Sequence, residues 1–289
     1  MDKKSWRHHY LPVFYLKGFT KESNTFKIYN VEEKRFIKNG KEFSPESYFF
    51  KKNANTINFK GNKTDFLETE HYSHFDNEIA KLFNKINSSD NSNKYSIDED
   101  DMPRLNHFVS LMYWRLPHKD SELKSIIESN NLNQLGLEIK NSDGTNNIIL
   151  EDEFKKNSQF LKTYKYLNSL MDSVRGYNCR TPYTIFETVS QFPFMCSDNP
   201  VLFKKSKDPK VFEDDYIFPL TGNKLFIRAK DTSELPAHLR IMVDTLIYKQ
   251  AVKYVSCSDE RYIEILDNNF EKKNISVEDL RIHIFDKLG

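Results

Sequence analysis

The chain has little glycine, little cysteine and almost no net charge. Its 289 residues include only 8 glycines, and these form neither a glycine-rich phosphate loop nor a dinucleotide-binding fingerprint. Three cysteines, Cys179, Cys196 and Cys257, stand far apart in the sequence, which fits neither a disulfide framework nor the ligand spacing of a zinc site. We therefore expect reduced cysteines in the core and find no sequence support for a nucleotide cofactor.

The formal net charge of +1 gives no global field that would draw the protein to nucleic acid or to anionic lipid. Any contact with nucleic acid must then come from a local basic patch. No segment approaches the roughly 18 consecutive apolar residues of a membrane span, and the basic N-terminus lacks the apolar run and cleavage site of a signal peptide. These absences predict a cytoplasmic protein without membrane contact.

Aromatic side chains supply much of the available apolar bulk. The hydrophobic fraction is 38%, and 23 Phe and 15 Tyr help bring the aromatic fraction to 14%. A chain of this length can bury a large core within one domain. We expect a single domain over residues 1–289 with a core rich in aromatic rings.

Hydrophobic periodicity predicts amphipathic helices on both sides of a block of short strands. Apolar residues recur at helical spacing between residues 66 and 127, between 160 and 174, and from 239 towards the C-terminus, whereas β-prone runs lie between 183 and 227. A small N-terminal β unit of about residues 1–60 and an exposed insertion at about 130–150 complete the expected organisation. Helices grouped around a small, mainly antiparallel sheet predict an α+β fold.

Residues 6–20, here called the N-terminal strip, crowd histidine, aromatic and cationic side chains into an apolar segment. Chain ends are usually polar and frayed, so this composition predicts a buried strip. His8 and His9 would point to opposite faces of a strand, and the sequence leaves open which of these candidate catalytic groups serves a site. Either imidazole can instead ligate a metal or bond a backbone carbonyl. Tyr15 and Lys17 are candidates for binding an anionic substrate.

Residues 197–200, Ser-Asp-Asn-Pro, follow a short apolar run and place Asp198 at a predicted strand end. Asp198 is a candidate catalytic acid and Asn199 a candidate substrate ligand, whereas the alternative is an Asx-turn in which Asp198 bonds the amides that follow it. Arg115 ends a predicted helix. It either anchors an acid such as Glu68 or Asp198, or clamps a phosphate or carboxylate.

Two further groups have the residue types of a binding site. His71, His74 and Glu78 would share one helix face and could ligate a divalent metal, although the pattern is not HExxH and a solvated face is the alternative. The lysines that follow Asp198 could form a local patch for nucleic acid, or simply a solvated loop. These lysines are Lys204, Lys205, Lys207 and Lys210.

Four segments together resemble a known family. They are His8-His9-x-x-Pro12-x-x-Tyr15-Leu16-x-x-Phe19, Glu68 at the start of a helix, Arg115-x-Pro117, and Phe194-x-x-Ser197-Asp198-Asn199-Pro200. In this order they resemble domain-of-unknown-function family 4238 over most of the chain. Val13 stands where that family commonly has glutamine, and Asp76 where it has glutamate. The resemblance implies a bacterial protein and supplies no activity.

Two hypotheses follow from these residues. The first is a hydrolase acting on nucleic-acid phosphodiesters through a composite site of His8 or His9, Arg115 and Asp198, with a divalent metal possible. It requires that the N-terminal strip pack beside residues 197–200, with Arg115 in the same hollow. The second is a non-catalytic binding or scaffold module, in which the same side chains form a buried structural network.

Overall fold

The computed structural model describes residues 6–59, 61–88, 101–130, 132, 138–157, 159–177, 183–187, 192–229, 237–271 and 276–288. The helical segments are α1 (Val13–Lys17), η1 (Ile37–Gly40), η2 (Pro45–Ser47), η3 (Leu67–Tyr72), α2 (Ser73–Ser88), α3 (Asp101–Arg115), α4 (Lys119–Ser129), α5 (Ile148–Lys156), α6 (Phe160–Tyr177), α7 (Ala237–Gln250), α8 (Glu260–Glu271) and α9 (Val277–Lys287). The strands are β1 (Arg7–His9), β2 (Phe26–Lys27), β3 (Tyr29–Asn30), β4 (Arg35–Phe36), β5 (Glu42–Phe43), β6 (Phe50–Lys52), β7 (Ile57–Phe59), β8 (Asn62–Thr64), β9 (Tyr183–Glu187), β10 (Cys196–Ser197), β11 (Leu202–Phe203), β12 (Tyr216–Pro219), β13 (Lys224–Arg228) and β14 (Tyr254–Ser256).

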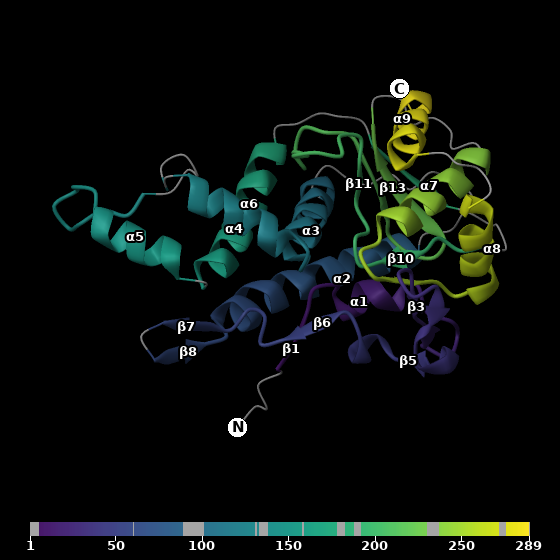
Figure 1. The fold of residues 1–289 in the computed structure, drawn as a ribbon, viewed down its shortest axis with the longest axis horizontal. Helices are drawn as coiled ribbons and strands as arrows, with labels where there is room; N and C mark the ends of the chain where they lie inside the picture. Colours follow the sequence, from purple (N-terminus) through teal and green to yellow (C-terminus); the bar gives the residue numbers. More distant parts are fainter. Residues whose placement is uncertain are drawn as a thin grey trace.

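The α+β fold predicted from the sequence is confirmed. The two largest sheets have the strand orders β11-β12-β13-β9 and β10-β14-β3-β4, and neighbouring strands run antiparallel. In Figure 1, α3, α4 and α6 lie to the left of strands β11 and β13, while α7, α8 and α9 lie to the right. The helices therefore group around small antiparallel sheets.

Helical periodicity correctly identified the buried faces of the helices near the site. On α2 the buried apolar residues are Ile79, Leu82, Phe83 and Ile86, and on α3 they include Leu105, Phe108, Val109 and Met112. Helix α3 packs against both α2 and α6. Because Arg115 is the last residue of α3, this packing carries its side chain to the edge of the core, where the residue is 8% exposed.

Several apolar residues of the N-terminal strip are buried, as predicted. Leu11, Tyr15 and Leu16 are each 0% exposed, and Tyr15 stacks on Phe218 of β12 with ring centroids 5.3 Å apart. Such an aromatic stack adds about 0.5–1.5 kcal/mol to the free energy gained by burial alone. The strip is thus docked on the sheet that contains β12, which fixes the position of β1 within the strip.

A close backbone approach holds the end of α1 against the sheet. The Gly18 carbonyl accepts a hydrogen bond from the Gly222 amide at 2.8 Å, in the turn that joins β12 to β13. A Cβ atom at position 18 would lie 2.9 Å from Thr221 Cγ2, a distance below van der Waals contact. Glycine is required here for space, because its backbone is in the ordinary helical region with φ −63°.

Strands from the first 60 residues are divided among several sheets. The β1–β6 and β2–β5 pairs form separate ribbons, whereas the β3–β4 hairpin pairs through β3 with β14 near the other end of the chain. Cys196 and Cys257 are buried free thiols, as expected, and Cys179 lies outside the described residues.

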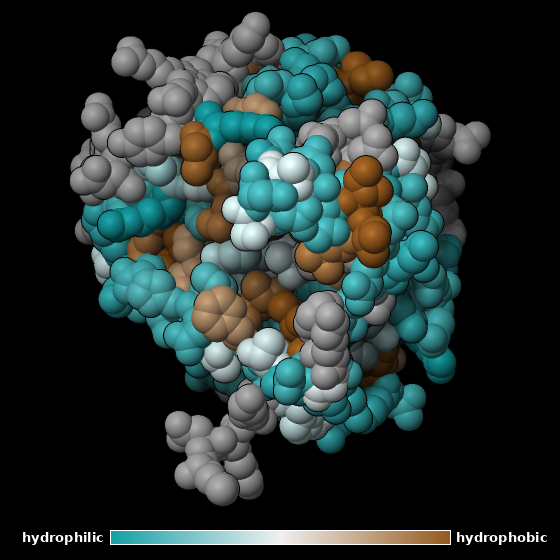
Figure 2. All heavy atoms as spheres, turned by 90° about the vertical axis from the view of Figure 1, so that its left-hand side faces the viewer, coloured by the Kyte–Doolittle hydropathy of each residue, from teal (hydrophilic) through white to brown (hydrophobic). Residues whose placement is uncertain are grey.

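The described part of residues 130–150 is largely exposed, including Ile148 and Ile149 at 70% and 84%. Figure 2 shows hydrophobic side chains in separate groups among hydrophilic ones on the face that α5 and the β7–β8 ribbon occupy.

Candidate functional site

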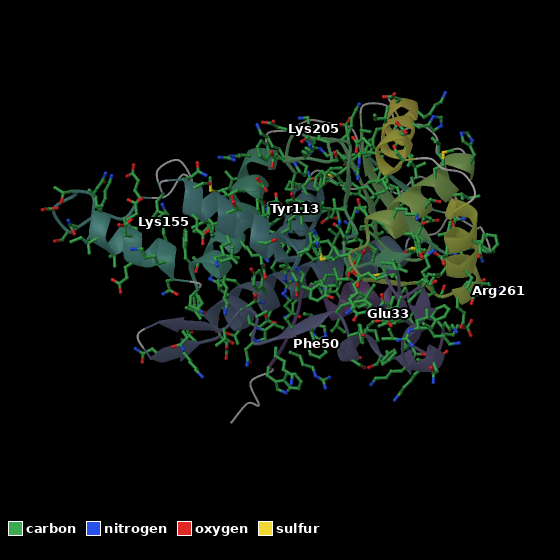
Figure 3. All side chains as sticks on the ribbon, in the orientation of Figure 1. Glu33, Phe50, Tyr113, Lys155, Lys205 and Arg261 are labelled. Carbon is green, nitrogen blue, oxygen red and sulfur yellow. The ribbon has the colours of Figure 1, made fainter. Side chains whose placement is uncertain are left out.

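A pocket of about 140 Å³ lies where the β1–β6 ribbon meets the helices. The antiparallel register sets His8 opposite Lys51 and His9 opposite Phe50, so β1 and β6 together form one wall. Figure 1 shows this ribbon below the helices, and Figure 3 labels Phe50 on it. The lining residues are His8, His9, Tyr10, Lys51, Ala54, Asn55, Tyr72, Arg115, Pro117, Asp120, Leu161, Lys162 and Lys165.

His8 is held by the backbone of the turn that follows β6. Its side chain is 1% exposed, and its Nδ1 accepts a hydrogen bond from the Asn55 amide N–H at 2.8 Å. In the neutral ring the proton therefore sits on Nε2. The Asn55 side chain in turn donates to Glu68 Oε2 at 2.7 Å, and this oxygen lies 3.9 Å from His8 Nδ1. Glu68 thus supports His8 through Asn55.

His9 has an unsatisfied ring nitrogen. Burial lowers the pKa of His9, and a hydrogen bond with the Glu46 backbone partly opposes that shift. The Nε2 atom is buried and has no hydrogen-bond partner, so the bond to Glu46 belongs to Nδ1. A neutral ring that donates from Nδ1 keeps its lone pair on Nε2. His9 therefore presents a buried proton acceptor in a residue that lines the pocket.

Arg115 forms a buried bidentate ion pair with Asp76 of α2. Its Nη1 lies 3.0 and 3.2 Å from the two Asp76 oxygens and its Nη2 lies 3.3 Å from Oδ2. The guanidinium also sits 4.3 Å from the Tyr72 ring centroid. Burial raises the pKa of Asp76, and the Arg115 charge opposes that rise. The sequence suggested Glu68 or Asp198 as the acid partner, but the packing of α2 against α3 supplies Asp76 instead.

Lysines from α6 and β6 add positive charge to the pocket. Lys165 donates to Asp120 Oδ1 at 2.6 Å, and Lys51 lies 3.6 Å from the other oxygen of Asp120. Lys162 donates to the Thr56 carbonyl at 2.6 Å. Burial lowers the pKa of both Lys162 and Lys165. An ammonium group with a lowered pKa gives up its proton more readily near neutral pH.

Asp198 is not among the residues that line the pocket. One of its oxygens accepts the Val252 N–H at 2.8 Å, and the other accepts the N–H groups of Lys253 and Tyr254 at 2.9 and 3.0 Å. Burial raises the pKa of Asp198 to about 6, against the effect of these three bonds. The Asp198 carboxylate does not accept the amides that follow it, as an Asx-turn would require, and the Asn199 N–H donates to Ser197 Oγ at 3.0 Å. The carboxylate instead joins β10 to the segment that leads from α7 into β14.

The candidate substrate-binding residues also lie outside the pocket lining. Asn199 donates to the Gln250 carbonyl at 3.0 Å and accepts from the Gln250 side chain at 2.6 Å, which continues the Asp198 network. The Tyr15 hydroxyl is fully buried within the strip's aromatic packing and has no partner. Lys17 is exposed and lies 3.9 Å from Glu46. The structure therefore brings together His8, His9 and Arg115 from the predicted set.

The candidate metal ligands do not converge. His71 bonds the Tyr166 hydroxyl at 2.8 Å, and Glu78 pairs with Lys81 at 2.6 Å. Over the described ranges, no group of three or more His, Cys, Asp or Glu side chains could hold a metal ion, so His71, His74 and Glu78 form no such group. His71 lies in the π-helical segment η3, whereas His74 and Glu78 lie on α2, so the three side chains do not follow the spacing of one regular α-helix.

In the run after Asp198, Lys204, Lys205 and Lys210 each lie near an acidic side chain. Lys204 lies 3.8 Å from Asp215, and Lys205 lies 2.6 Å from Asp214. These local pairs are typical of a solvated loop.

A second, more open hollow of about 460 Å³ lies between α4, α5 and α6. Its lining mixes lysines with acids, and it contains no histidine among its described residues. The smaller pocket is therefore the better candidate for proton-transfer chemistry.

Sequence reasoning missed Asn55, Asp120, Lys162 and Lys165. Lys162 and Lys165 carry a weak signal, since their i, i+3 spacing puts them on one face of α6 beside its apolar stripe. Asn55 acts partly through its backbone N–H, which residue type cannot reveal.

Comparison with known proteins supports the family resemblance. The family model described as "Protein of unknown function (DUF4238)" matches residues 7–255, which is most of the chain. The protein belongs to the DUF4238 family. No curated protein and no solved structure matches it. Within the described ranges, no helix is both long and apolar enough to cross a membrane.

Proposed function

We propose that the pocket binds the phosphate of a phosphodiester and hydrolyses it, with nucleic acid of the bacterial cytoplasm as the substrate class. The observation that carries the proposal is the His9 Nε2 atom, buried and without a partner, in a residue that lines a pocket with four cationic side chains. An unsatisfied buried nitrogen costs stability, commonly about 1–3 kcal/mol, and such groups are often functional. A water molecule or a substrate oxygen is its natural partner.

The charges around the pocket favour an anion. Asp76 neutralises Arg115, and Asp120 lies between Lys165 and Lys51. Lys162 hydrogen-bonds to neutral oxygen atoms, so its charge is left to act on a ligand. A volume of about 140 Å³ admits one phosphate group with its ester oxygens and a nearby water molecule.

The residues supply both proton transfers of a hydrolysis. His9 Nε2 takes a proton from water, and the water oxygen bonds to phosphorus as the bond to the leaving ester oxygen breaks. The leaving oxygen takes a proton from Lys165 Nζ, whose pKa burial lowers. Solvent then returns the proton from His9 to Lys165. Arg115, fixed by Asp76, stabilises the charge on phosphate without reorganising. Asp198 has no part in this scheme, because backbone amides occupy both of its oxygens.

The alternative is a binding or scaffold module without chemistry. It is favoured by a separate observation, namely that Arg115 and Asp198 are each paired with protein groups in the manner of structural residues. In this function the pocket binds an anion and releases it unchanged.

Hydrolysis assays on RNA, DNA and bis(4-nitrophenyl) phosphate, with EDTA, Mg²⁺ or Mn²⁺, test the proposal. We expect cleavage by the wild type and a loss of about 10²–10⁴-fold in kcat for His9→Ala. The melting temperature should stay unchanged or rise, since removing the unsatisfied group relieves a cost. His74→Ala, an exposed histidine on α2, is the matched control and should keep full activity.

The pH profile gives a further check. A general base must be unprotonated, and burial lowers the pKa of His9 below its ordinary 6.5. The acid limb of kcat/KM should therefore lie below pH 6.5, with activity falling as the pH drops through that lowered value. If no substrate is cut, or if His9→Ala cleaves at the wild-type rate, the protein is not this hydrolase.

A further inference from the structure

The β1–β6 ribbon carries a row of rings that leads from the surface to the pocket. Trp6, directly before β1, is 44% exposed. Its ring centroid lies 5.8 Å from that of Phe50, which lies 5.5 Å from the His9 ring. Soluble proteins seldom expose tryptophan, and here the exposed ring begins a row that ends at a pocket residue. The row therefore connects solvent to the candidate site.

Cationic side chains flank the same row. The Arg7 guanidinium lies 5.0 Å from the Trp6 ring centroid and 5.2 Å from that of Phe50. Lys52 Nζ lies 4.9 Å from the Trp6 centroid, and the register places Arg7 opposite Lys52 across the ribbon. Lys51 continues the positive charge into the pocket lining. Rings interleaved with cations along one ribbon match a ligand with flat apolar faces joined by negative charges.

We infer that this ribbon binds single-stranded nucleic acid, with a base stacked on Trp6 and the strand's backbone led along Arg7, Lys52 and Lys51 to the pocket. Base–aromatic stacking with a tracking line of cations is the general way in which proteins hold single strands. The inference rests on the proposed function, because it names how that function's substrate reaches His9.

A duplex fits this surface poorly. Its bases are stacked on one another and cannot cover Trp6 without being unpaired, whereas a single strand can splay a base onto the ring. The pocket volume of about 140 Å³ also suits one phosphate group and excludes a double helix. The ribbon should therefore select single strands by shape and stacking.

Fluorescence anisotropy with a labelled oligothymidylate of about ten nucleotides tests the inference. Phosphorothioate linkages keep the strand from being hydrolysed during the measurement. We expect Trp6→Ala to weaken binding about 5- to 100-fold, as loss of one stacked base would. Trp6→Phe should retain most of the affinity. Phe66→Ala removes another exposed aromatic ring, 52% exposed and outside the pocket lining, and should leave binding unchanged.

Salt dependence tests the path of the backbone. Removing one phosphate contact should reduce the slope of log affinity against log salt by about 0.7 for a single strand. Lys52→Ala should show this reduction, while Lys81→Ala, a 72% exposed lysine on α2, should not. Equal affinity of Trp6→Ala and the wild type, or a duplex bound as tightly as the single strand, would overturn the inference.

The two proposals fail in different ways. Bis(4-nitrophenyl) phosphate has no strand to stack, so its hydrolysis reports on the pocket alone. Hydrolysis of this compound without Trp6-dependent binding of the oligonucleotide overturns the strand path and leaves the proposed function in place. Trp6-dependent binding with no hydrolysis of any substrate supports the strand path and overturns the chemistry.

Discussion

The pocket beside β1 and the turn at residues 197–200 contain similar residue types but use them differently. In the turn, both Asp198 oxygens accept backbone N–H groups from one segment, and Asn199 exchanges hydrogen bonds with Gln250. His9, which lines the pocket, has a buried Nε2 without a partner. Polar groups saturated by backbone are typical of structural connections, whereas an unsatisfied nitrogen in a residue that lines a pocket can accept a hydrogen bond from a ligand.

The fold distributes these residues between two places, although the sequence suggested one composite site. The sequence placed histidines, Arg115 and Asp198 in one hypothetical site because each type suits acid–base or anion chemistry. The fold divides them, since His8, His9 and Arg115 line one pocket and Asp198 ties β10 to the segment that leads into β14. Residue type alone therefore did not reveal which of these side chains line the pocket.

The largest expected effect concerns the Arg115–Asp76 pair, because Arg115 both lines the pocket and forms a buried ion pair. Their side chains are 4% and 21% exposed, so Arg115→Ala leaves a largely buried carboxylate without its partner. We expect the free energy of unfolding to fall by about 3–5 kcal/mol, measured by urea denaturation.

A double variant gives the control for this prediction. Arg115→Met combined with Asp76→Leu removes both charges and should recover most of the lost stability, because apolar pairs of similar volume often replace buried ion pairs without cost. If Arg115→Ala alone were as stable as the wild type but inactive, the pair with Asp76 would not anchor the fold, and Arg115 would act on substrate alone.

A somewhat smaller loss of folding stability is expected when Asp198 is replaced. The Asp198→Ala variant leaves the amides of Val252, Lys253 and Tyr254 without their acceptor, and unfolding should become easier by about 3 kcal/mol. Asp198→Asn keeps one acceptor oxygen and should lose less. Hydrolytic activity per folded molecule should stay near the wild-type value in both variants. A stable but inactive Asp198→Ala protein would instead show that this carboxylate takes part in catalysis and does not serve the fold alone.

Sequence patterns predicted the packing well where the spacing of apolar residues alone determines which side chains are buried. The buried faces of α2 and α3 follow from 3.6-residue spacing, and burial of the strip follows from apolar residues such as Leu11 and Leu16. The strip also docks on the sheet that contains β12, where Tyr15 stacks on Phe218.

The partners of polar side chains could not be predicted in the same way. Arg115 pairs with Asp76, which stands 39 residues earlier, because α2 and α3 pack against each other and bring the two residues together. Asp198 finds its donors 54 to 56 residues later, in backbone N–H groups that every residue type carries. Long-range hydrogen bonds to backbone leave no signature in composition or spacing, so a single sequence cannot assign them.

The smallest expected effect tests the contact that orients β1 for the pocket. Gly18→Ala would place a Cβ atom 2.9 Å from Thr221 Cγ2, and α1 or the β12–β13 turn must shift to make room. Such overpacking costs about 1–3 kcal/mol, and a single methyl group at the end of a five-residue helix should fall at the lower end. Thr221→Ser removes the obstructing methyl group but keeps the hydroxyl that bonds the Lys224 amide. The Gly18→Ala, Thr221→Ser double variant should therefore be more stable in thermal melts than Gly18→Ala alone. If the double variant is no more stable, the loss of stability in Gly18→Ala does not arise from the contact with Thr221. The packing of α1 on the sheet would then be looser than the hydrogen-bonded network that holds Asp198.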